Sequence, residues 1–180
     1  MSYCEYVDSL PLDNVHKIYH DTQYGFPLDS DDELFGRLLL EINQAGLSWN
    51  TILNKQDNFR RAYSNYSIEK VASYNETEIA RLLSDEGIIR NRLKINAAVH
   101  NAKVIIDLQN EFGSFKNWLD SQRDLNLEQW VKLFKKHFKF TGGEITKEFL
   151  MSTGYLTGAH IERCVIQNKI LSLKPAYIRN

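Results

Sequence analysis

Hydrophobic side chains along most of the chain recur every three or four residues, the spacing that places them on one face of an α-helix. Residues 29–46 show this spacing at Leu34, Leu38 and Ile42. The longest periodic stretch is 91–113, whose apolar face is predicted to comprise Leu93, Ala97, Ala98, Ala102, Ile105 and Leu108. No segment alternates apolar and polar residues over a length that would suit a β-strand. The pattern therefore predicts an all-α fold.

Capping and turn residues set the expected boundaries of the helices. Acidic residues open the 29–46 helix and Gly46 ends it. Ser48 is the expected N-cap of a helix that continues through Ile52, Phe59 and Tyr63. The remaining helices are expected from Asn75 to Gly87, over 115–119, over 127–137, and from the Thr141-Gly142-Gly143 turn to Met151. The basic segment 168–180 is expected to be loosely ordered.

The composition is that of an ordinary globular protein. The 180 residues are 43% hydrophobic and 25% charged, enough for one domain or for two small lobes that share a cleft. A formal net charge of −1 provides no general attraction to nucleic acid, so any DNA-binding face must be a local patch. There is no signal-peptide pattern and no apolar run of the roughly 18 residues that a membrane span needs. We therefore expect a cytoplasmic protein with no membrane partner.

Two cysteines lie near opposite ends of the chain, and each has histidines close by. His160 and Cys164 are four residues apart, while Cys4 is followed by His16 and His20. Four Cys and His ligands form the tetrahedral set of a structural zinc site, and such a site would join the two ends of the chain. The residues alone do not decide between His16 and His20. They also leave open that the cysteines are small core residues and the histidines surface groups.

Four segments, taken in order, resemble the DNA-3-methyladenine glycosylase I family of bacteria. They are YHDTQYGFPLDSDDELFGRLLLEINQAGLSW, GIIRNRLKINAAVHNA, KKHFKFTG and GAHIERC. The resemblance implies a single unit over residues 1–180, with two helical lobes around a base-binding cleft, in the helix-hairpin-helix glycosylase superfamily. It also implies a structural zinc ion that joins the ends of the chain through Cys4, His20, His160 and Cys164, with His16 outside the site.

The same resemblance implies a base pocket. By position, Glu41 would be the catalytic residue and face the edge of a flipped base, and Tyr19 and Trp49 would face its ring. Tyr6, where the family commonly has a tryptophan, and Asn43 are further base-binding candidates. An alkylated adenine is positively charged, so an aromatic face and a carboxylate should bind it better than neutral adenine. Without the resemblance, the residues favour structural roles: Glu41 as a surface carboxylate, Trp49 as a core anchor and Tyr19 as a packing residue.

The DNA contact is expected at the hairpin that opens the helix before Met151. Backbone N–H groups of such a hairpin bind a phosphate without any net positive charge. The candidates are Lys139, Thr141, Gly142 and Gly143, with Lys135, Lys136 and Lys147 as nearby charges. A Gly-Gly turn is also an ordinary connection between two helices. Arg90, Arg92 and Lys94 form a second basic cluster, which also fits a solvated helix face.

Several positions depart from the family pattern, and they leave the substrate range open. They are Tyr6, Gln23-Tyr24, Ile42-Asn43 and Gly158-Ala159. The expected partner is alkylated double-stranded DNA, the expected product is 3-methyladenine, and the expected form is a bacterial, nucleoid-associated monomer. A glycosylase for another damaged base is one alternative. The other is a zinc-stapled DNA-binding module without catalysis.

Overall fold

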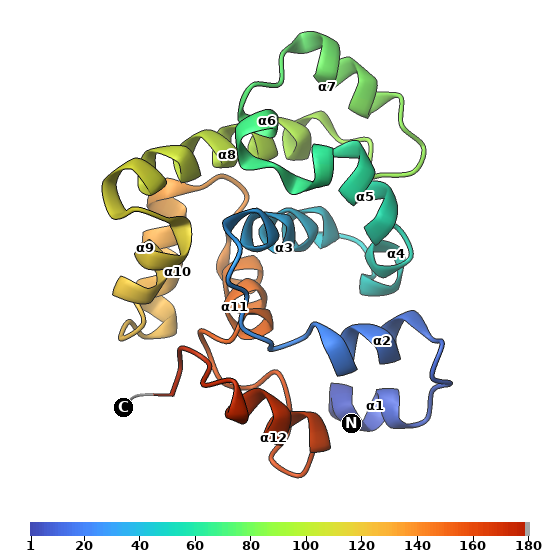
Figure 1. Ribbon diagram of the computed structural model, residues 1–180. Helices are drawn as coiled ribbons and strands as arrows, with labels where there is room; N and C mark the ends of the chain where they lie inside the picture. Colours follow the sequence, from blue (N-terminus) through green and yellow to red (C-terminus); the bar gives the residue numbers. More distant parts are fainter. Residues whose placement is uncertain (179–180) are drawn as a thin grey trace.

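The computed structural model describes residues 1–178, and all regular structure in that range is helical (Figure 1). The α-helices are α1 (Tyr3–Asp8), α2 (Val15–Thr22), α3 (Asp31–Gln44), α4 (Trp49–Leu53), α5 (Gln56–Ala62), α6 (Ile68–Ala72), α7 (Glu76–Leu83), α8 (Arg92–Phe112), α9 (Phe115–Ser121), α10 (Leu127–His137), α11 (Gly143–Ser152) and α12 (Val165–Ser172). A short 3₁₀ helix, η1 (Ser64–Tyr66), links α5 to α6. The all-α prediction is confirmed.

Helix α3 runs through the middle of the molecule, and most other helices are arranged around it (Figure 1). It contacts α4, α5, α6, α8, α9 and α11. Because neighbours surround it, every residue from Leu34 to Asn43 is buried, including the charged Arg37 and Glu41. Burying a charge is costly unless the charge is paired or hydrogen-bonded, so these two residues of α3 are candidates for a functional role.

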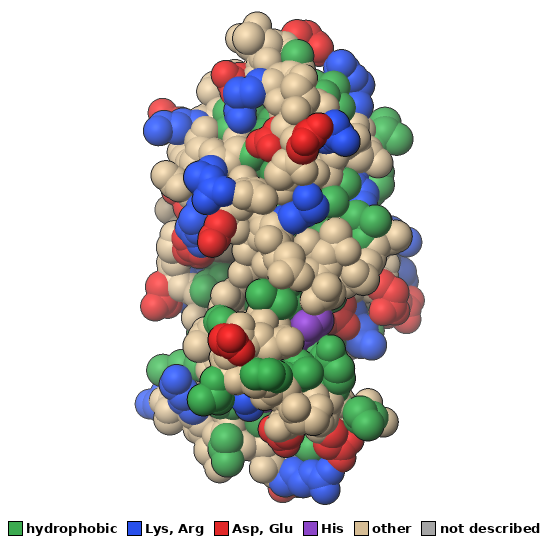
Figure 2. Space-filling model, turned by 90° about the vertical axis from the view of Figure 1, so that its right-hand side faces the viewer, with side chains coloured by type: hydrophobic (Ala, Val, Ile, Leu, Met, Phe, Trp, Pro, Cys, Tyr) green, Lys and Arg blue, Asp and Glu red, His purple; other side chains and the backbone are tan. Residues whose placement is uncertain are grey.

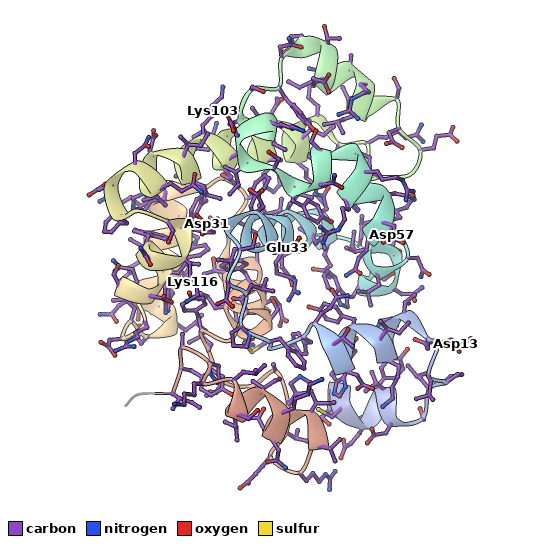
Figure 3. The ribbon with its side chains drawn as sticks, viewed as in Figure 1. Asp13, Asp31, Glu33, Asp57, Lys103 and Lys116 are labelled. Carbon is purple, nitrogen blue, oxygen red and sulfur yellow. The ribbon has the colours of Figure 1, made fainter. Side chains whose placement is uncertain are left out.

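Asp31, at the start of α3, holds the junction between α8 and α9. Its carboxylate accepts hydrogen bonds from the backbone N–H groups of Phe115 (2.8 Å) and Lys116 (2.9 Å), and from the side chain of Gln109 (2.7 Å). Figure 3 shows Asp31 on the side of α3 that faces Lys116. A carboxylate at the first turn of α9 satisfies N–H groups that a helix start leaves unpaired.

Side-chain caps fix most helix starts where the sequence predicted them. Ser48 accepts from the Thr51 N–H at 3.2 Å, and Asn75 accepts from the Thr77 N–H at 2.9 Å. The helix predicted through Tyr63 is broken, however, into α4 and α5. Asn54 interrupts it, because its side chain donates to the Asn50 carbonyl at 2.8 Å and closes α4.

Three further boundaries differ from expectation. The helix predicted to reach Gly87 ends at Leu83, and Leu93 lies 66% exposed, because α8 packs inward only from the next residues onward. The segment predicted to be loosely ordered begins within α12 and supplies residues 168–172 of that helix, including the fully buried Ile170. The last two residues of that segment, 179–180, lie outside the described range.

The first and last helices of the chain lie close together. Helices α1 and α12 are neighbours at the bottom of Figure 1. In the face shown in Figure 2, basic and acidic side chains are interspersed, and neither sign forms a continuous field. No helix among the described residues is both long and apolar enough to cross a membrane.

Candidate active site

A cavity of about 520 Å³ opens where α1, α2, α3, α4 and α11 meet. Its lining is Tyr3, His16, Tyr19, Tyr24, Glu41, Gln44, Trp49, Glu144 and Glu148. Four of these residues are Tyr or Trp, three are glutamates, and none is Lys or Arg. The cavity therefore suits a flat aromatic ligand that carries positive charge or donates hydrogen bonds.

The aromatic rings enclose the cavity from several directions. The Tyr19 ring lies 5.2 Å from that of Trp49 and 5.5 Å from that of Tyr24, centroid to centroid. Tyr3 meets Tyr24 edge-on at 5.6 Å. The Tyr19 hydroxyl is buried and has no hydrogen-bond partner among the described residues. Because an unpaired buried hydroxyl is costly, this group is best explained by a ligand that completes its hydrogen bonding.

Glu41 brings a carboxyl group into this aromatic cavity. It is only 4% exposed, and burial raises the pKa of its carboxyl to about 8. Arg37, one turn earlier on α3, lowers that pKa, whereas Glu148 raises it. Burial likewise raises the pKa of Glu148, while a hydrogen bond from the Tyr24 hydroxyl at 3.3 Å acts in the opposite direction. A cation placed between the rings would stabilise the ionised form of both carboxyl groups.

The structure brings together only part of the predicted base pocket. Tyr19, Glu41 and Trp49 do line one cavity, whereas Tyr6 and Asn43 do not. Tyr6 is 41% exposed and stacks on the outer side of Tyr3, with the ring centroids 6.2 Å apart. Asn43 is buried and its amide donates to the Leu39 carbonyl at 2.8 Å. Tyr3, three residues earlier, lines the cavity instead.

Sequence reasoning missed the lining residues from α11 and from the neighbourhood of α2. Glu144 and Glu148 are four residues apart and so share one face of α11, a signal that was available in the sequence. Tyr24 belongs to one of the departures from the family pattern and does reach the cavity. The Ile42-Asn43 departure does not reach it.

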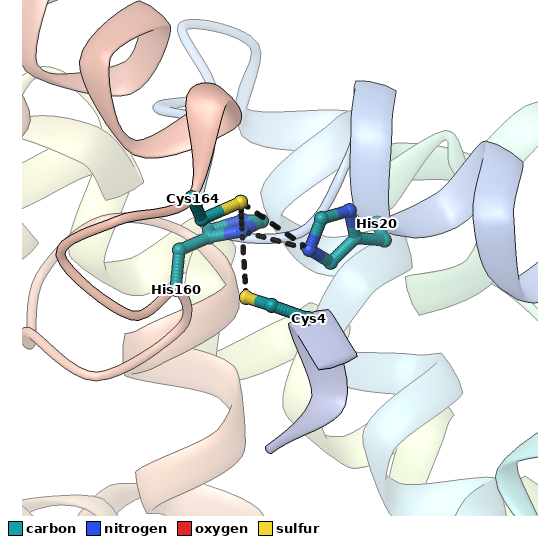
Figure 4. A group of neighbouring side chains, drawn as sticks. All are labelled: Cys4, His20, His160 and Cys164. Atoms are coloured by element: carbon teal, nitrogen blue, oxygen red, sulfur yellow. Dashed lines mark hydrogen bonds between the residues drawn. The ribbon is translucent and has the colours of Figure 1, made fainter. Parts of the chain in front are cut away.

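Next to the cavity, four side chains from the two ends of the chain converge (Figure 4). Their donor atoms, from Cys4, His20, His160 and Cys164, all lie within 4.8 Å of one another. His160 Nδ1 lies 3.7 Å from the Cys4 sulfur, 3.6 Å from the Cys164 sulfur and 3.1 Å from His20 Nε2. The group could hold a metal ion, and His16 is not part of it.

The histidine rings of this group are oriented by hydrogen bonds on their far sides. His20 Nδ1 contacts the Asp21 carboxylate at 2.6 Å, and His160 Nε2 contacts the Tyr24 carbonyl at 2.7 Å. The remaining nitrogen of each ring therefore faces the sulfurs, as it would in a metal site. The segment between His160 and Cys164 is not helical. Cys164 is instead the N-cap of α12.

The predicted DNA-contact hairpin lies where α10 turns into α11. Gly142 is the N-cap of α11 and makes no side-chain cap. A Cβ atom added at Gly142 or at Gly143 would meet no other atom within 4 Å. Thr141 is buried, and its hydroxyl donates to the Phe134 carbonyl at 3.1 Å. Asn101 fixes the hairpin by bonding both the N–H (2.8 Å) and the carbonyl (3.1 Å) of Lys139. The two glycines are thus open to a partner, and Thr141 faces inward.

The model of the methyladenine glycosylase family matches residues 10–167. The chain belongs to this family. It is 31% identical to DNA-3-methyladenine glycosylase 1 of Escherichia coli (strain K12), an alignment that covers 91% of this chain and 96% of the relative. It is 34% identical to a DNA-3-methyladenine glycosylase of Haemophilus influenzae over 59% of this chain and 57% of that protein.

Solved structures of this family share the fold. A tyrosine-to-phenylalanine variant of 3-methyladenine DNA glycosylase I, in complex with 3-methyladenine, gives a TM-score of 0.82 at 30% identity, covering 92% of this chain and 97% of the other. The Staphylococcus aureus enzyme, studied for its recognition of 3-methyladenine, gives a TM-score of 0.79 at 31% identity, covering 87% and 93%.

The buried carboxyl of Glu41 predicts a pH-dependent stability. Because its folded-state pKa of about 8 lies above the ordinary value of 4.5, the unfolded chain loses this proton first as pH rises. The parent should therefore lose stability relative to Glu41→Gln between about pH 5 and 8, by up to about 1.4 kcal/mol per pH unit. Urea denaturation of both proteins across this range measures the difference.

Glu33→Gln is the control for this comparison. The bidentate bond from Arg60 (2.7 and 2.9 Å) lowers the pKa of Glu33, so its contribution is already complete above its ordinary pKa. The difference between the parent and Glu33→Gln should stay constant from about pH 5 to 8. A constant difference for Glu41→Gln as well would contradict the raised pKa.

Proposed function

We propose that this protein is a monofunctional DNA glycosylase that flips 3-methyladenine out of alkylated double-stranded DNA and hydrolyses its N-glycosyl bond. The observation that carries the proposal is the buried carboxyl of Glu41 inside an aromatic cavity that has no Lys or Arg in its lining. Family membership and the similarity to enzymes of this name support it. We propose that it acts as a monomer.

The cavity fits the charge change in the reaction. A 3-methylated adenine attached to deoxyribose is a cation, and it becomes neutral when the N-glycosyl bond breaks. Electron-rich ring faces and a carboxylate bind such a cation in preference to neutral adenine. Because the leaving group already carries the charge that favours departure, the protein need not supply a proton to it. Water then attacks the oxocarbenium-like sugar carbon that remains.

The residues of the cavity have distinct roles in this proposal. Tyr19 and Trp49 hold the ring of the flipped base, and the unpaired Tyr19 hydroxyl and the Glu41 carboxylate meet its polar edge. None of the lining residues is an aspartate, so the acidic groups available are Glu41, Glu144 and Glu148. The rings also exclude water from the base side, which strengthens the electrostatic effect of Glu41.

Replacing Glu41 tests this role directly. Glu41→Gln retains the shape, removes the charge and offers an N–H donor where an acceptor is needed. Release of 3-methyladenine should slow by about 10²-fold or less, since this leaving group is intrinsically labile. Single-turnover assays on alkylated duplex DNA, with the released bases separated by chromatography, measure the rate. A parental rate in the variant would remove the main support for the pocket assignment.

We propose that DNA binds at the hairpin before α11, as a helix-hairpin-helix element. The open backbone of Gly142 and Gly143 would bind a phosphate, and the exposed Lys139 adds charge beside it. Thr141 supports this element from inside through its bond to the Phe134 carbonyl. The same helix carries Glu144 and Glu148 into the cavity, so a phosphate held at its first turn would place the duplex beside the base pocket.

A carboxylate at the hairpin should weaken DNA binding. Gly143→Glu puts negative charge where the phosphate is expected, and the open space around the position leaves folding unaffected. Duplex affinity should fall, and the slope of log affinity against log salt should become shallower by about 0.9 for each phosphate that the protein no longer neutralises. Fluorescence anisotropy at several salt concentrations provides both values. Gly143→Ala should bind like the parent, and equal binding by Gly143→Glu would exclude the hairpin.

We propose that the Cys4, His20, His160 and Cys164 group holds a structural zinc ion. A tetrahedral zinc site has S–N edges of about 3.6 Å and an N–N edge of about 3.3 Å, given its usual bond lengths. The observed separations of 3.6 to 3.8 Å and 3.1 Å are close to these values. Four protein donors leave no open position for substrate, so the ion would stabilise the fold and take no part in the reaction.

Metal content tests this proposal. Protein purified without added metal should contain one zinc ion per chain by elemental analysis. His20→Ala removes a donor and should lower that content, whereas His16→Ala should retain it, since His16 bonds the Tyr3 hydroxyl and lies outside the group. Folded parent protein that lacks zinc, with both thiols freely reactive, would contradict the proposal.

A further inference from the structure

Arg37 is a buried positive charge that the reaction described above leaves unassigned. It lies on α3, one turn before Glu41, and is only 7% exposed. Its Nη1 donates to the backbone carbonyls of Ser152 (3.0 Å) and Gln23 (3.4 Å). Its guanidinium carbon lies 5.5 Å from the centroid of the Tyr19 ring.

These contacts join the helices that carry the base pocket. Ser152 is the last residue of α11, which supplies Glu144 and Glu148 to the cavity. Gln23 is the C-cap of α2, which supplies Tyr19. One side chain of α3 therefore bonds the C-terminal ends of both neighbouring helices, where backbone carbonyls have no partner within their own helix.

The charge of Arg37 is not cancelled by an ion pair in the described part of the chain. Glu33, on the same helix, is engaged by Arg60 instead. Arg37 also lines a second cavity of about 310 Å³, with Glu33 of α3 and Asp57 of α5 on two sides of it (Figure 3). This polar cavity reduces the cost of burying the guanidinium. A guanidinium does not lose its proton in a protein, so the charge is permanent.

We propose that Arg37 is a positioning residue for base excision: it fixes the ends of α2 and α11 against α3, and its charge enlarges the fraction of Glu41 that is ionised. This inference rests on the proposed glycosylase function. Burial alone would hold Glu41 in its neutral form, which attracts a cationic base far less. The charge one turn away on α3 favours the ionised form, in the direction opposite to burial.

Glu41 lies among titratable groups from several elements, of which Arg37 and Glu148 act on its pKa. Arg37 lies on the same helix as Glu41, and Glu144 and Glu148 come from α11. The other groups are His16 and Tyr19 of α2, Tyr24 just after α2, and Tyr3 of α1. Glu148 opposes Arg37, because a second negative charge disfavours ionisation of Glu41. Arg37 is the only Lys or Arg among the charges that act on the Glu41 pKa.

The first experiment needs no DNA. Carboxyl resonances of ¹³C-labelled glutamate are followed against pH, and the Glu41 signal is assigned by its loss in Glu41→Gln. In Arg37→Met the midpoint of Glu41 should rise by at least about one pH unit, and in Arg37→Lys by less than half as much. Arg60→Met, which removes an arginine that is paired with Glu33, should leave it unchanged. An unchanged midpoint in Arg37→Met would overturn the proposal.

The second experiment follows base release against pH. At a pH well below the midpoint, raising the Glu41 pKa by one unit lowers its ionised fraction about tenfold. Arg37→Met should therefore release the base about tenfold more slowly at pH 7, and its rate should recover as pH rises. A purely structural role would slow the reaction equally at every pH and would overturn the charge assignment. In the Glu41→Gln background, Arg37→Met should leave the shape of the profile unchanged.

The two experiments separate this inference from the proposed function. A parent protein that releases no 3-methyladenine contradicts the glycosylase proposal, while the carboxyl titration still decides whether Arg37 acts on Glu41. If Arg37→Met does not fold, Arg37→Gln, which retains an amide donor without the charge, takes its place in both measurements.

Discussion

The burial of α3 is the constraint on which the rest of the structure depends. Ten successive residues of this helix are inside the molecule, and two of them are charged. A charge in such a place must be bonded, neutralised or used. Arg37 is bonded to two helix-end carbonyls, whereas Glu41 has no hydrogen-bonding partner among the described residues and faces a cavity. The same burial that raises the pKa of Glu41 makes its interaction with a cation strong.

The Cys4, His20, His160 and Cys164 group, which could hold a metal ion, and the cavity share the same short pieces of backbone. Cys4 follows Tyr3 directly, and His20 follows Tyr19 directly. The Tyr24 carbonyl, moreover, is the hydrogen-bond partner of His160. Three aromatic residues of the cavity are therefore placed by the group that joins the chain ends. Fixing these four side chains also fixes the rings beside them, so the group can support the cavity without taking part in the reaction.

Sequence reasoning succeeded where periodicity is long and failed where a helix is short. The buried face of α3 follows directly from Leu34, Leu38 and Ile42. Helix α1 has only six residues, and no pattern in it says whether Tyr3 or Tyr6 faces inward. Tertiary contacts with α2 and Tyr24 make that choice, so Tyr6 was named as a base-binding candidate although Tyr3 lines the cavity. The family resemblance grouped Glu41, Tyr19 and Trp49, and the structure places all three in the lining of one cavity, while their roles toward a base stay predictions.

The arrangement around Glu41 is a balance of opposing effects. A carboxylate with a full ion pair in the free protein would be neutralised before the base arrived, and its attraction for a cation would be weakened. A carboxyl group with burial alone would be ionised in a still smaller fraction at physiological pH. Arg37 acts through one helical turn and makes no direct ion pair, so it opposes burial without occupying the carboxylate. In the proposed function, the cationic base completes the pairing, and neutral adenine, which lacks the charge, does not.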